Sequence, residues 1–409
     1  MIRIMKSICF ILSFLITSVE VAGQSFEVPL PARVITRSLE RIPSRPFSIT
    51  SDTVFISEKP SSPKFEHPLN DVLAIVVGPA NSRSINSRWR SEITQSGERE
   101  TRLQSEACFV DGQILPGTLE FEGERVTWNS IQLGRYPITL EDISWIRFKK
   151  NVRVPVAEAE DIVVLTNGDR IVGLVTEIAD PLPIERSDGE SVVNVPLNRV
   201  AALSLVNPEV PPSGLRIWTS EGSVFSAKKI LVDEEGYVTV ESPSLSSKKE
   251  ISFPVRKLRG ILMNPEELLP LSKISPQVDS GLATGIRSWT PPPVVAKGFW
   301  PMGAATIDFY GPMRARWSLP EAGVIFSAIA ELPIDSNRGD FDLVIRDGGR
   351  EVFRTRINSE NPICPIRVRL DSSDLELEME MANGGPIQDS LHLHEAVLML
   401  PSAEKSGDN

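Results

Sequence analysis

Residues 162–175 read IVVLTNGDRIVGLV, in which two apolar runs flank an Asn-Gly pair. Asn-Gly is the commonest pair in the primed two-residue turns of β-hairpins, because both central positions of such a turn take a positive φ. The stretch therefore predicts a hairpin from Ile162 to Val175. Gly173 falls inside the second predicted strand, where a glycine often marks a bulge or a tight bend.

The same pattern occurs three times along the chain. The opening glycines and the small residues five positions later are Gly112 and Gly117, Gly168 and Gly173, and Gly222 and Ala227. A closing apolar strand begins 31, 32 and 36 positions after the three opening glycines. Such regular spacing indicates repeated structural units. We expect small antiparallel β modules, packed edge to edge or as small barrels, which stabilise one another.

The C-terminal part of the chain has longer alternating runs. Residues 375–381 read LELEMEM, and Asp347-Gly348-Gly349 lies between two strand-like segments. Strict alternation means that one face of a sheet is buried and the other is wet. The predicted fold class is mostly β, with tandem small antiparallel β modules followed by a C-terminal jelly-roll-like β-sandwich.

Domain boundaries follow from these patterns and from the many prolines and serines of residues 24–70, which predict an extended leader or linker. The predicted segments are a signal peptide (1–23), the leader (24–70), a first β module with a preceding strand (71–150), a second (155–207), a third (213–263), a β-sandwich (275–401) and a disordered tail (402–409).

The N-terminus has the features of a secretory signal. Arg3 and Lys6 precede an apolar run from Ile8 to Val19, and Val21-Ala22-Gly23 supplies small residues for cleavage before Gln24. The run is shorter than the ~20 residues of a spanning helix. An uncleaved anchor is the alternative. We expect a periplasmic or extracellular protein with no transmembrane segment in the mature chain.

Composition narrows the function classes. The chain has 409 residues, 41% of them hydrophobic, and a net charge of −11, which disfavours nonspecific binding to nucleic acid. Three cysteines and three histidines exclude Cys-rich zinc modules and a dense disulfide scaffold. We expect Cys108 and Cys364 to be separate buried thiols, with a disulfide as the alternative.

The C-terminal segment resembles a known family. Residues 339–345, 350–353, 365–370, 375–378 and 385–389 are similar to the carbohydrate-binding module of the NPCBM type, found at the ends of some secreted glycoside hydrolases. The late aspartate of that family matches Asp389. Where the family often has a tryptophan, this chain has His392, His394 and Glu395. The resemblance implies carbohydrate binding. The upstream repeats resemble β modules of exported multidomain proteins.

Sugar rings pack on flat aromatic side chains while polar groups bind their hydroxyls, so candidate ligand residues combine the two kinds. Trp300 lies between Gly298 and Gly303 and is predicted to be an exposed, loop-borne platform. Most other aromatic residues of this region are expected in the core. The ligand-binding candidates are Trp300, Tyr310, Trp317, Asp389, His392 and His394.

Three further clusters contain side chains that could act in catalysis or bind a metal ion. Glu376, Glu378 and Glu380 would lie ~7 Å apart, as in an inverting glycosidase, but any alternating strand gives that spacing, so a solvated sheet face is expected. His392 and His394, with Asp389, could bind a metal, but zinc needs three or four ligands, so ordinary surface or rim histidines are expected. The acidic stretch 335–342 is expected to be a polar loop and not a calcium site.

No compact catalytic motif is present, so no catalytic residue, metal or cofactor is predicted. We expect an exported, noncatalytic protein that binds a glycan or cell-surface polysaccharide through its C-terminal β-sandwich. The alternative is a structural or protein–protein scaffold of the cell envelope, with another envelope protein as partner. A third possibility is a secreted hydrolase with an undetected acid pair.

Overall fold

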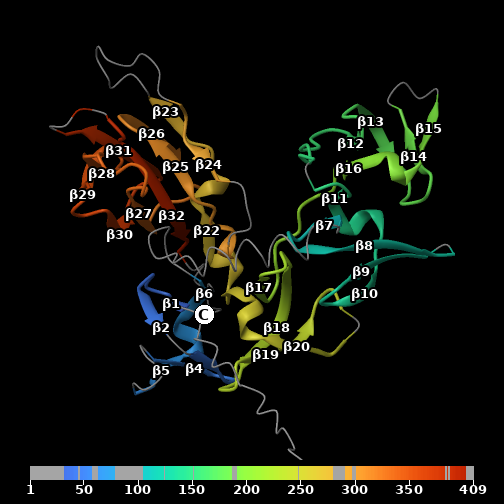
Figure 1. Cartoon of the computed structure of the whole chain (residues 1–409), viewed down its shortest axis with the longest axis horizontal. Helices are drawn as coiled ribbons and strands as arrows, with labels where there is room; N and C mark the ends of the chain where they lie inside the picture. Colours follow the sequence, from blue (N-terminus) through green and yellow to red (C-terminus); the bar gives the residue numbers. More distant parts are fainter. Residues whose placement is uncertain are drawn as a thin grey trace, which may run out of the picture.

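The computed structural model describes residues 32–44, 47–57, 63–78, 105–123, 125–150, 152–186, 191–246, 248–279, 291–296, 301–382, 385 and 387–401. Its regular structure consists of β-strands and a few one-turn 3-10 helices (Figure 1). The predicted mostly β fold class is confirmed. No helix in the described ranges is both long and apolar enough to cross a membrane. Residues 1–23, the predicted signal, lie outside these ranges.

The three predicted repeats form three five-stranded units. The first unit comprises β7 (Ser105–Phe109), β8 (Ile114–Glu122), β9 (Arg125–Ser130), β10 (Gly134–Pro137) and β11 (Ile143–Arg147). The second comprises β12 (Asp161–Leu165), β13 (Arg170–Val175), β14 (Leu182–Glu185), β15 (Val192–Val195) and β16 (Val200–Ser204). The third comprises β17 (Leu215–Thr219), β18 (Val224–Val232), β19 (Tyr237–Pro243), β20 (Glu250–Pro254) and β21 (Leu258–Leu262).

One pairing scheme describes all three units. The first four strands form a meander, a 3-10 turn follows, and the fifth strand pairs antiparallel with the first. The 3-10 turns are η4 (Leu140–Asp142), η5 (Leu197–Arg199) and η6 (Val255–Lys257). Each unit thereby buries a small apolar centre between its strands, and these centres join into one larger core.

The hairpin at Asn167-Gly168 is present, but the predicted turn type is wrong. The N–H of Gly168 donates to the carbonyl of Leu165 (2.9 Å), and the N–H of Leu165 donates to the carbonyl of Asp169 (2.8 Å). Only Gly168, at φ +91°, takes a positive φ in this turn. The loop therefore has three residues ending in one left-handed position, which requires a glycine at a single place.

A fourth unit precedes the other three, and from residue 32 onward it corrects the prediction that residues 24–70 form an extended leader. Its strands are β1 (Ala32–Thr36), β2 (Arg41–Ser44), β3 (Phe47–Ile49), β4 (Thr53–Ile56), β5 (Phe65–Pro68) and β6 (Val72–Val77), with η1 (Leu69–Asp71) before the last. β1 pairs with β2 and β6, and β3, β4 and β5 form a meander, so β2 and β3 together replace the second strand. We call residues 32–77 the N-terminal unit.

The turn of the N-terminal unit has the hydrogen bonds of the glycine turns. The N–H of Leu39 donates to Thr36 (2.8 Å), and that of Thr36 donates to Glu40 (3.0 Å). Leu39 has φ +58°, in the place of Gly168. Val72, the first residue of the closing strand, lies 33 positions after Leu39, which falls within the range of 31 to 36 positions in the other units. The sequence alone favours a leader here because residues 24–70 are rich in proline and serine, and because this copy has leucine where the other units have the turn glycine.

The four units associate in nested pairs through their closing strands. β11 of the first unit pairs antiparallel with β16 of the second, and β6 of the N-terminal unit pairs antiparallel with β21 of the third. Residues 32–77 and 215–262 therefore enclose the two central units in sequence, while their last strands lie side by side in space (Figure 1). This edge-to-edge pairing removes exposed strand edges.

The C-terminal β-sandwich has two antiparallel sheets around one apolar core. One has the order β24-β25-β32-β27-β30, with β22 also paired to β32, and the other β23-β26-β31-β28-β29. The strands are β22 (Leu268–Pro270), β23 (Gln277–Asp279), β24 (Val294–Val295), β25 (Ile307–Tyr310), β26 (Met313–Ser318), β27 (Val324–Glu331), β28 (Phe341–Asp347), β29 (Arg350–Ile357), β30 (Ile363–Leu370), β31 (Asp374–Met381) and β32 (Ser390–Met399). The order of β25 to β32 is that of an eight-stranded jelly roll, as predicted.

The sandwich packs against the N-terminal and third units. A bulge at Glu395, which has φ +48°, interrupts the pairing of β32 with β27. Beyond this bulge Ala396 packs in the sandwich core, and Val397 faces the neighbouring units. The apolar contact contains Ile35, Leu39, Leu73, Val76, Trp218, Leu262, Leu268 and Val397.

The two cysteines of the described chain are free thiols. Cys108 is buried in β7, and Cys364 is partly exposed in β30. The expected absence of a bridge holds for this pair, but only Cys108 is a buried thiol. Burial raises the pKa of Cys108 to about 12, so the side chain behaves as an apolar group.

Candidate functional site

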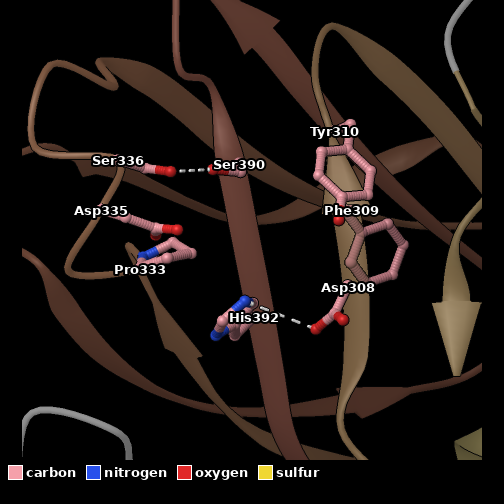
Figure 2. Close-up of a pocket in the computed structure, with 8 residues that line it drawn as sticks. All are labelled: Asp308, Phe309, Tyr310, Pro333, Asp335, Ser336, Ser390 and His392. Atoms are coloured by element: carbon pink, nitrogen blue, oxygen red, sulfur yellow. Dashed lines mark hydrogen bonds and ion pairs between the residues drawn. The ribbon is translucent and has the colours of Figure 1, made fainter. Parts of the chain in front are cut away.

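A pocket at the end of strands β25 and β32 contains two of the predicted ligand residues, Tyr310 and His392. Asp308 and Tyr310 come from β25, and Ser390 and His392 lie directly opposite them on β32. Figure 2 shows β32 between Tyr310 on one side and the loop that carries Pro333, Asp335 and Ser336 on the other. The full lining is Asp308, Phe309, Tyr310, Pro333, Asp335, Ser336, Ser390 and His392.

The pocket offers an aromatic wall and several hydrogen-bonding groups. Tyr310 is 41% exposed, so part of its ring is open to solvent. The hydroxyls of Ser336 and Ser390 hydrogen-bond each other at 2.5 Å, which joins the loop to β32 (Figure 2). The volume of the pocket is about 80 Å³. Sites that enclose drug-sized ligands measure roughly 300–1,000 Å³, so this one suits contact with one edge of a small ring.

Asp389 does not line the pocket but positions the two segments that do. Its side chain is buried, and Oδ1 accepts a hydrogen bond from the N–H of Asp340 at 3.0 Å. Its carbonyl accepts another from the N–H of Gly311 at 2.7 Å. The residue predicted as a ligand contact from the family resemblance thus connects the loop after β27 to the residue that follows Tyr310.

Below the pocket, two histidines of β32 share one face of the sheet with carboxylates of both neighbouring strands. Nε2 of His392 lies 3.5 Å from Oδ1 of Asp308 on β25 (Figure 2). Nε2 of His394 lies 2.7 Å from Oε2 of Glu331 on β27, and its Nδ1 lies 2.9 Å from Oγ1 of Thr306. His392, which is 32% exposed and lines the pocket, fits the prediction of surface or rim histidines, whereas His394 is only 12% exposed and does not.

The electrostatics of Asp308 reflect this enclosure. Burial raises the pKa of its carboxyl, and the nearby His392 and His394 act in the opposite direction. A carboxylate with a fixed imidazole neighbour can accept hydrogen bonds from a bound hydroxyl.

Trp317 corrects the prediction of an aromatic ligand residue on β26. The side chain is only 1% exposed and packs edge to face on Phe309, with ring centroids 6.2 Å apart. It belongs to the core between the two sheets. Trp300, the predicted platform, lies outside the described residues.

The glutamates of β31 are placed on one face as predicted, but that face is not solvated. Glu376 is 3% and Glu378 5% exposed. Nη2 of Arg316 lies 2.7 Å from Oε2 of Glu376, and Nη2 of Arg314 lies 3.0 Å from Oε1 of Glu378. Arg346 contacts Glu376, Glu378 and Glu380 together. Arginines from β26 and β28 thus cover the row of acids.

This arrangement opposes acid catalysis by the row. Burial raises the pKa of Glu376, but hydrogen bonds from Arg316 and Arg346 outweigh burial and leave the pKa below its ordinary value. Hydrogen bonding from Arg354 likewise lowers the pKa of Glu380. A glycosidase needs one carboxyl with a raised pKa to protonate the leaving group.

Sequence reasoning missed Asp308, Glu331 and Ser336. Asp308 stands in an alternating strand beside Tyr310, and a pattern of period two could have placed both near a sheet end. The proximity of Glu331 and Ser336 to β32 depends on pairing between distant strands, for which the sequence has no local signal.

Comparisons with known proteins give no family by sequence. No protein-family model and no curated protein matches the chain. Among solved structures, the CBM51 module of Clostridium perfringens GH95 in complex with methyl-galactose matches with 12% identity and a TM-score of 0.26, covering 32% of this chain and 99% of that one.

Two further solved structures have similar scores. The tandem CBM51 modules of a family 98 glycoside hydrolase from Streptococcus pneumoniae match with 11% identity and a TM-score of 0.26, covering 72% of this chain and 88% of that one. An exo-β-1,3-galactanase from Phanerochaete chrysosporium matches with 9% identity and a TM-score of 0.21, covering 85% of this chain and 74% of that one. These values establish neither a family nor a ligand, and the function must be argued from the pocket.

Proposed function

We propose that this chain is an exported, noncatalytic protein that binds a glycan through the β25–β32 pocket of its C-terminal β-sandwich. The observation that carries the proposal is the pocket itself, in which the half-exposed ring of Tyr310 stands beside Asp308, Ser390 and His392. Export rests on the signal-like residues 1–23 alone.

The chemistry of the pocket suits a sugar. The C–H face of a pyranose packs on an aromatic ring, while carboxylates, hydroxyls and imidazole exchange hydrogen bonds with its hydroxyls. The small volume and the exposed position favour a terminal sugar residue of a longer glycan over a fully enclosed small molecule. Strand β32, which ends the segment that resembles an NPCBM-type module, contributes Ser390 and His392 to this pocket.

A noncatalytic role fits the acids of the sandwich. The glutamates of β31 are paired with arginines, and the pKa values of Glu376 and Glu380 are lowered. Several polar groups of the pocket lie on paired strands of one sheet, and such fixed positions suit recognition of a ligand.

A glycan array probed with the full chain tests the proposal, followed by titration calorimetry with the best glycan. We expect Tyr310→Ala to weaken binding at least about tenfold, the loss of one stacking contact of roughly 1.4 kcal/mol. Tyr237→Ala is the matched control, because Tyr237 is similarly exposed but lies in the third unit. Equal affinity of both variants, or no glycan bound at millimolar concentration, would refute the proposal.

The alternative is a structural or protein–protein scaffold, and one patch of the second unit favours it. Val172, Leu174 and Val192 are 44%, 58% and 54% exposed. Leu174 and Val192 flank the exposed Glu185 in the β13–β14–β15 ladder, so their side chains lie on one face of these strands with a carboxylate between them. Crosslinking of the Leu174→Asp variant tests this alternative. If the chain is a scaffold, the substitution should abolish crosslinking to the partner protein. If the chain binds a glycan through the sandwich, the substitution should leave glycan binding unchanged.

A further inference from the structure

Glu331, His392 and His394 bring one carboxylate oxygen and two imidazole nitrogens within 4.8 Å of one another. Glu331 lies directly opposite His392 in the β27–β32 ladder, and His394 follows on the same face of β32. Three potential ligands therefore come from two adjacent strands in the middle of a sheet, where the backbone is held by hydrogen bonds on both sides.

The three groups are shielded from water to different degrees. Glu331 is fully buried, at 0% exposure, and the side chains of His394 and His392 are 12% and 32% exposed. An anionic carboxylate removed from water needs a cation or strong hydrogen bonds beside it. The imidazole of His394, with Nε2 2.7 Å from Oε2 of Glu331, is one such hydrogen-bond partner, and a metal ion held by the same groups would supply a full positive charge while also engaging His392.

The groups around the cluster orient the imidazoles as a metal would require. Oγ1 of Thr306 lies 2.9 Å from Nδ1 of His394 and can accept the Nδ1 proton, which would free Nε2 to bind an ion held between it and Glu331. Oδ1 of Asp308 lies 3.5 Å from Nε2 of His392. Hydroxyl and carboxylate partners of this kind fix the ring orientation of metal-bound histidines.

The geometry points to a divalent transition-metal site formed by Glu331, His392 and His394, with Thr306 and Asp308 as its outer partners. Two imidazole nitrogens and one carboxylate are a ligand set for Zn²⁺, Co²⁺ or Fe²⁺, whereas Ca²⁺ and Mg²⁺ take oxygen ligands. Metal–ligand bonds of ~2.1 Å place tetrahedral ligand atoms about 3.4 Å apart. The three candidate ligand atoms lie within 4.8 Å of one another.

The site would fasten β27 to β32 beneath the pocket. Three protein ligands leave a fourth position for water or another small ligand. His392 lies in both the cluster and the pocket wall, so a bound ion would also fix that part of the pocket. The inference stands independently of the glycan proposal, because it concerns binding of the metal alone.

The test uses the untagged full chain, freed of metal with a chelator and then titrated with Zn²⁺ by calorimetry and with Co²⁺ by visible absorption. We expect one equivalent to bind and Co²⁺ to develop d–d bands that Zn²⁺ removes and Ca²⁺ does not. His392→Ala and His394→Ala should each weaken binding by at least about 100-fold. Glu331→Gln should do the same without changing the size of the side chain.

His67→Ala is the matched control. His67 is the remaining histidine of the chain, and it lies on β5 of the N-terminal unit. This variant should bind Zn²⁺ as the unmodified chain does. If His394→Ala fails to fold, His392→Ala and the Co²⁺ spectrum still decide the question. Absence of binding at micromolar metal, or unchanged affinity in His392→Ala, would overturn the inference.

Discussion

The guanidinium of Arg33 on β1 forms an ion pair with the carboxylate of Glu395 on β32, 362 positions further along the chain. Their side chains are only 10% and 12% exposed. Arg41 of β2 contacts the same carboxylate, and Arg33 also donates to the carbonyl of Gly78 at 2.6 Å. The N-terminal unit is thereby joined to the last strand of the sandwich, and this contact depends on the bulge that turns Glu395 outward.

Replacement of Glu395 by alanine is expected to lower the free energy of unfolding by about 3 kcal/mol, because two buried guanidinium groups lose their counter-charge. Denaturant unfolding measures the change. Glu234→Ala is the control, since the pair of Glu234 with Lys64 is exposed and should contribute below about 1 kcal/mol. Similar effects of the two substitutions would contradict a buried contact between the sandwich and the N-terminal unit.

Leu39 combines a left-handed backbone with a buried side chain. At such a position the glycine variant should be more stable than the alanine variant. Leu39→Ala should destabilise by about 3 kcal/mol through lost packing. Leu39→Gly should be about 1 kcal/mol more stable than Leu39→Ala, because glycine has no strain at positive φ.

At Leu73, the second residue of β6, the order should reverse, with the alanine variant more stable than the glycine variant. Thermal unfolding of the four variants measures both orders. The same order at both positions would show that Leu39 does not occupy the turn position held by glycine in the other units.

Gly173 is required by the close approach of two strands. A Cβ at this residue would lie 2.3 Å from the carbonyl oxygen of Glu185. Gly173→Ala should therefore destabilise by roughly 3 kcal/mol, as expected for a backbone collision. Gly168→Ala, which meets no neighbour but has φ +91°, should lose only about 1 kcal/mol. Urea unfolding that ranks Gly168→Ala as the worse variant would contradict the strand packing described.

Acid should weaken the sandwich through the row of glutamates on β31. The folded pKa values of Glu376 and Glu380 lie below the ordinary 4.5. Their contribution to stability is therefore full above about pH 4.5 and is lost as the pH falls through the folded values. Stability measured by urea unfolding should decline as the pH falls below about 4.5.

Replacement of Arg346 by methionine removes the arginine that contacts all three glutamates. This variant should flatten the acid decline, because the folded pKa values would move back toward the unfolded ones. Arg369→Met, on an exposed pair with Asp371, is the control and should leave the slope unchanged. A steeper decline in Arg346→Met would refute this account.

Cys108 and Cys364 should differ in thiol reactivity. The pKa of Cys108 is raised to about 12 by burial, so almost no thiolate forms near neutral pH. Cys364 is partly exposed on β30. Ellman's reagent should label Cys364 in the native protein and label Cys108 only after unfolding, with Cys364→Ser and Cys108→Ser variants assigning the signals. Rapid native labelling of Cys108 would contradict its burial.

The candidate site was only partly predictable. Tyr310 and His392 were expected to contact a ligand, and the structure places both in the pocket. Trp317 was expected beside them but faces the core, because the residues of a strand alternate between faces and its own face was not known. Asp308 and Glu331 join the histidines only through the pairing of β25, β32 and β27.

Local patterns alone determined the three glycine-turn units and the alternating strands of the sandwich, because hairpin turns and period-two burial are properties of neighbouring residues. The N-terminal unit escaped those patterns, since Leu39 stands at its turn in place of the glycine and the surrounding residues 24–70 are rich in proline and serine. Tertiary structure alone decided the nested pairing of β6 with β21, the contact of Arg33 with Glu395, and the meeting of Glu331 with His394. Each of these contacts joins strands that are far apart in sequence. The free energy of their association cannot be inferred from any short segment of the chain.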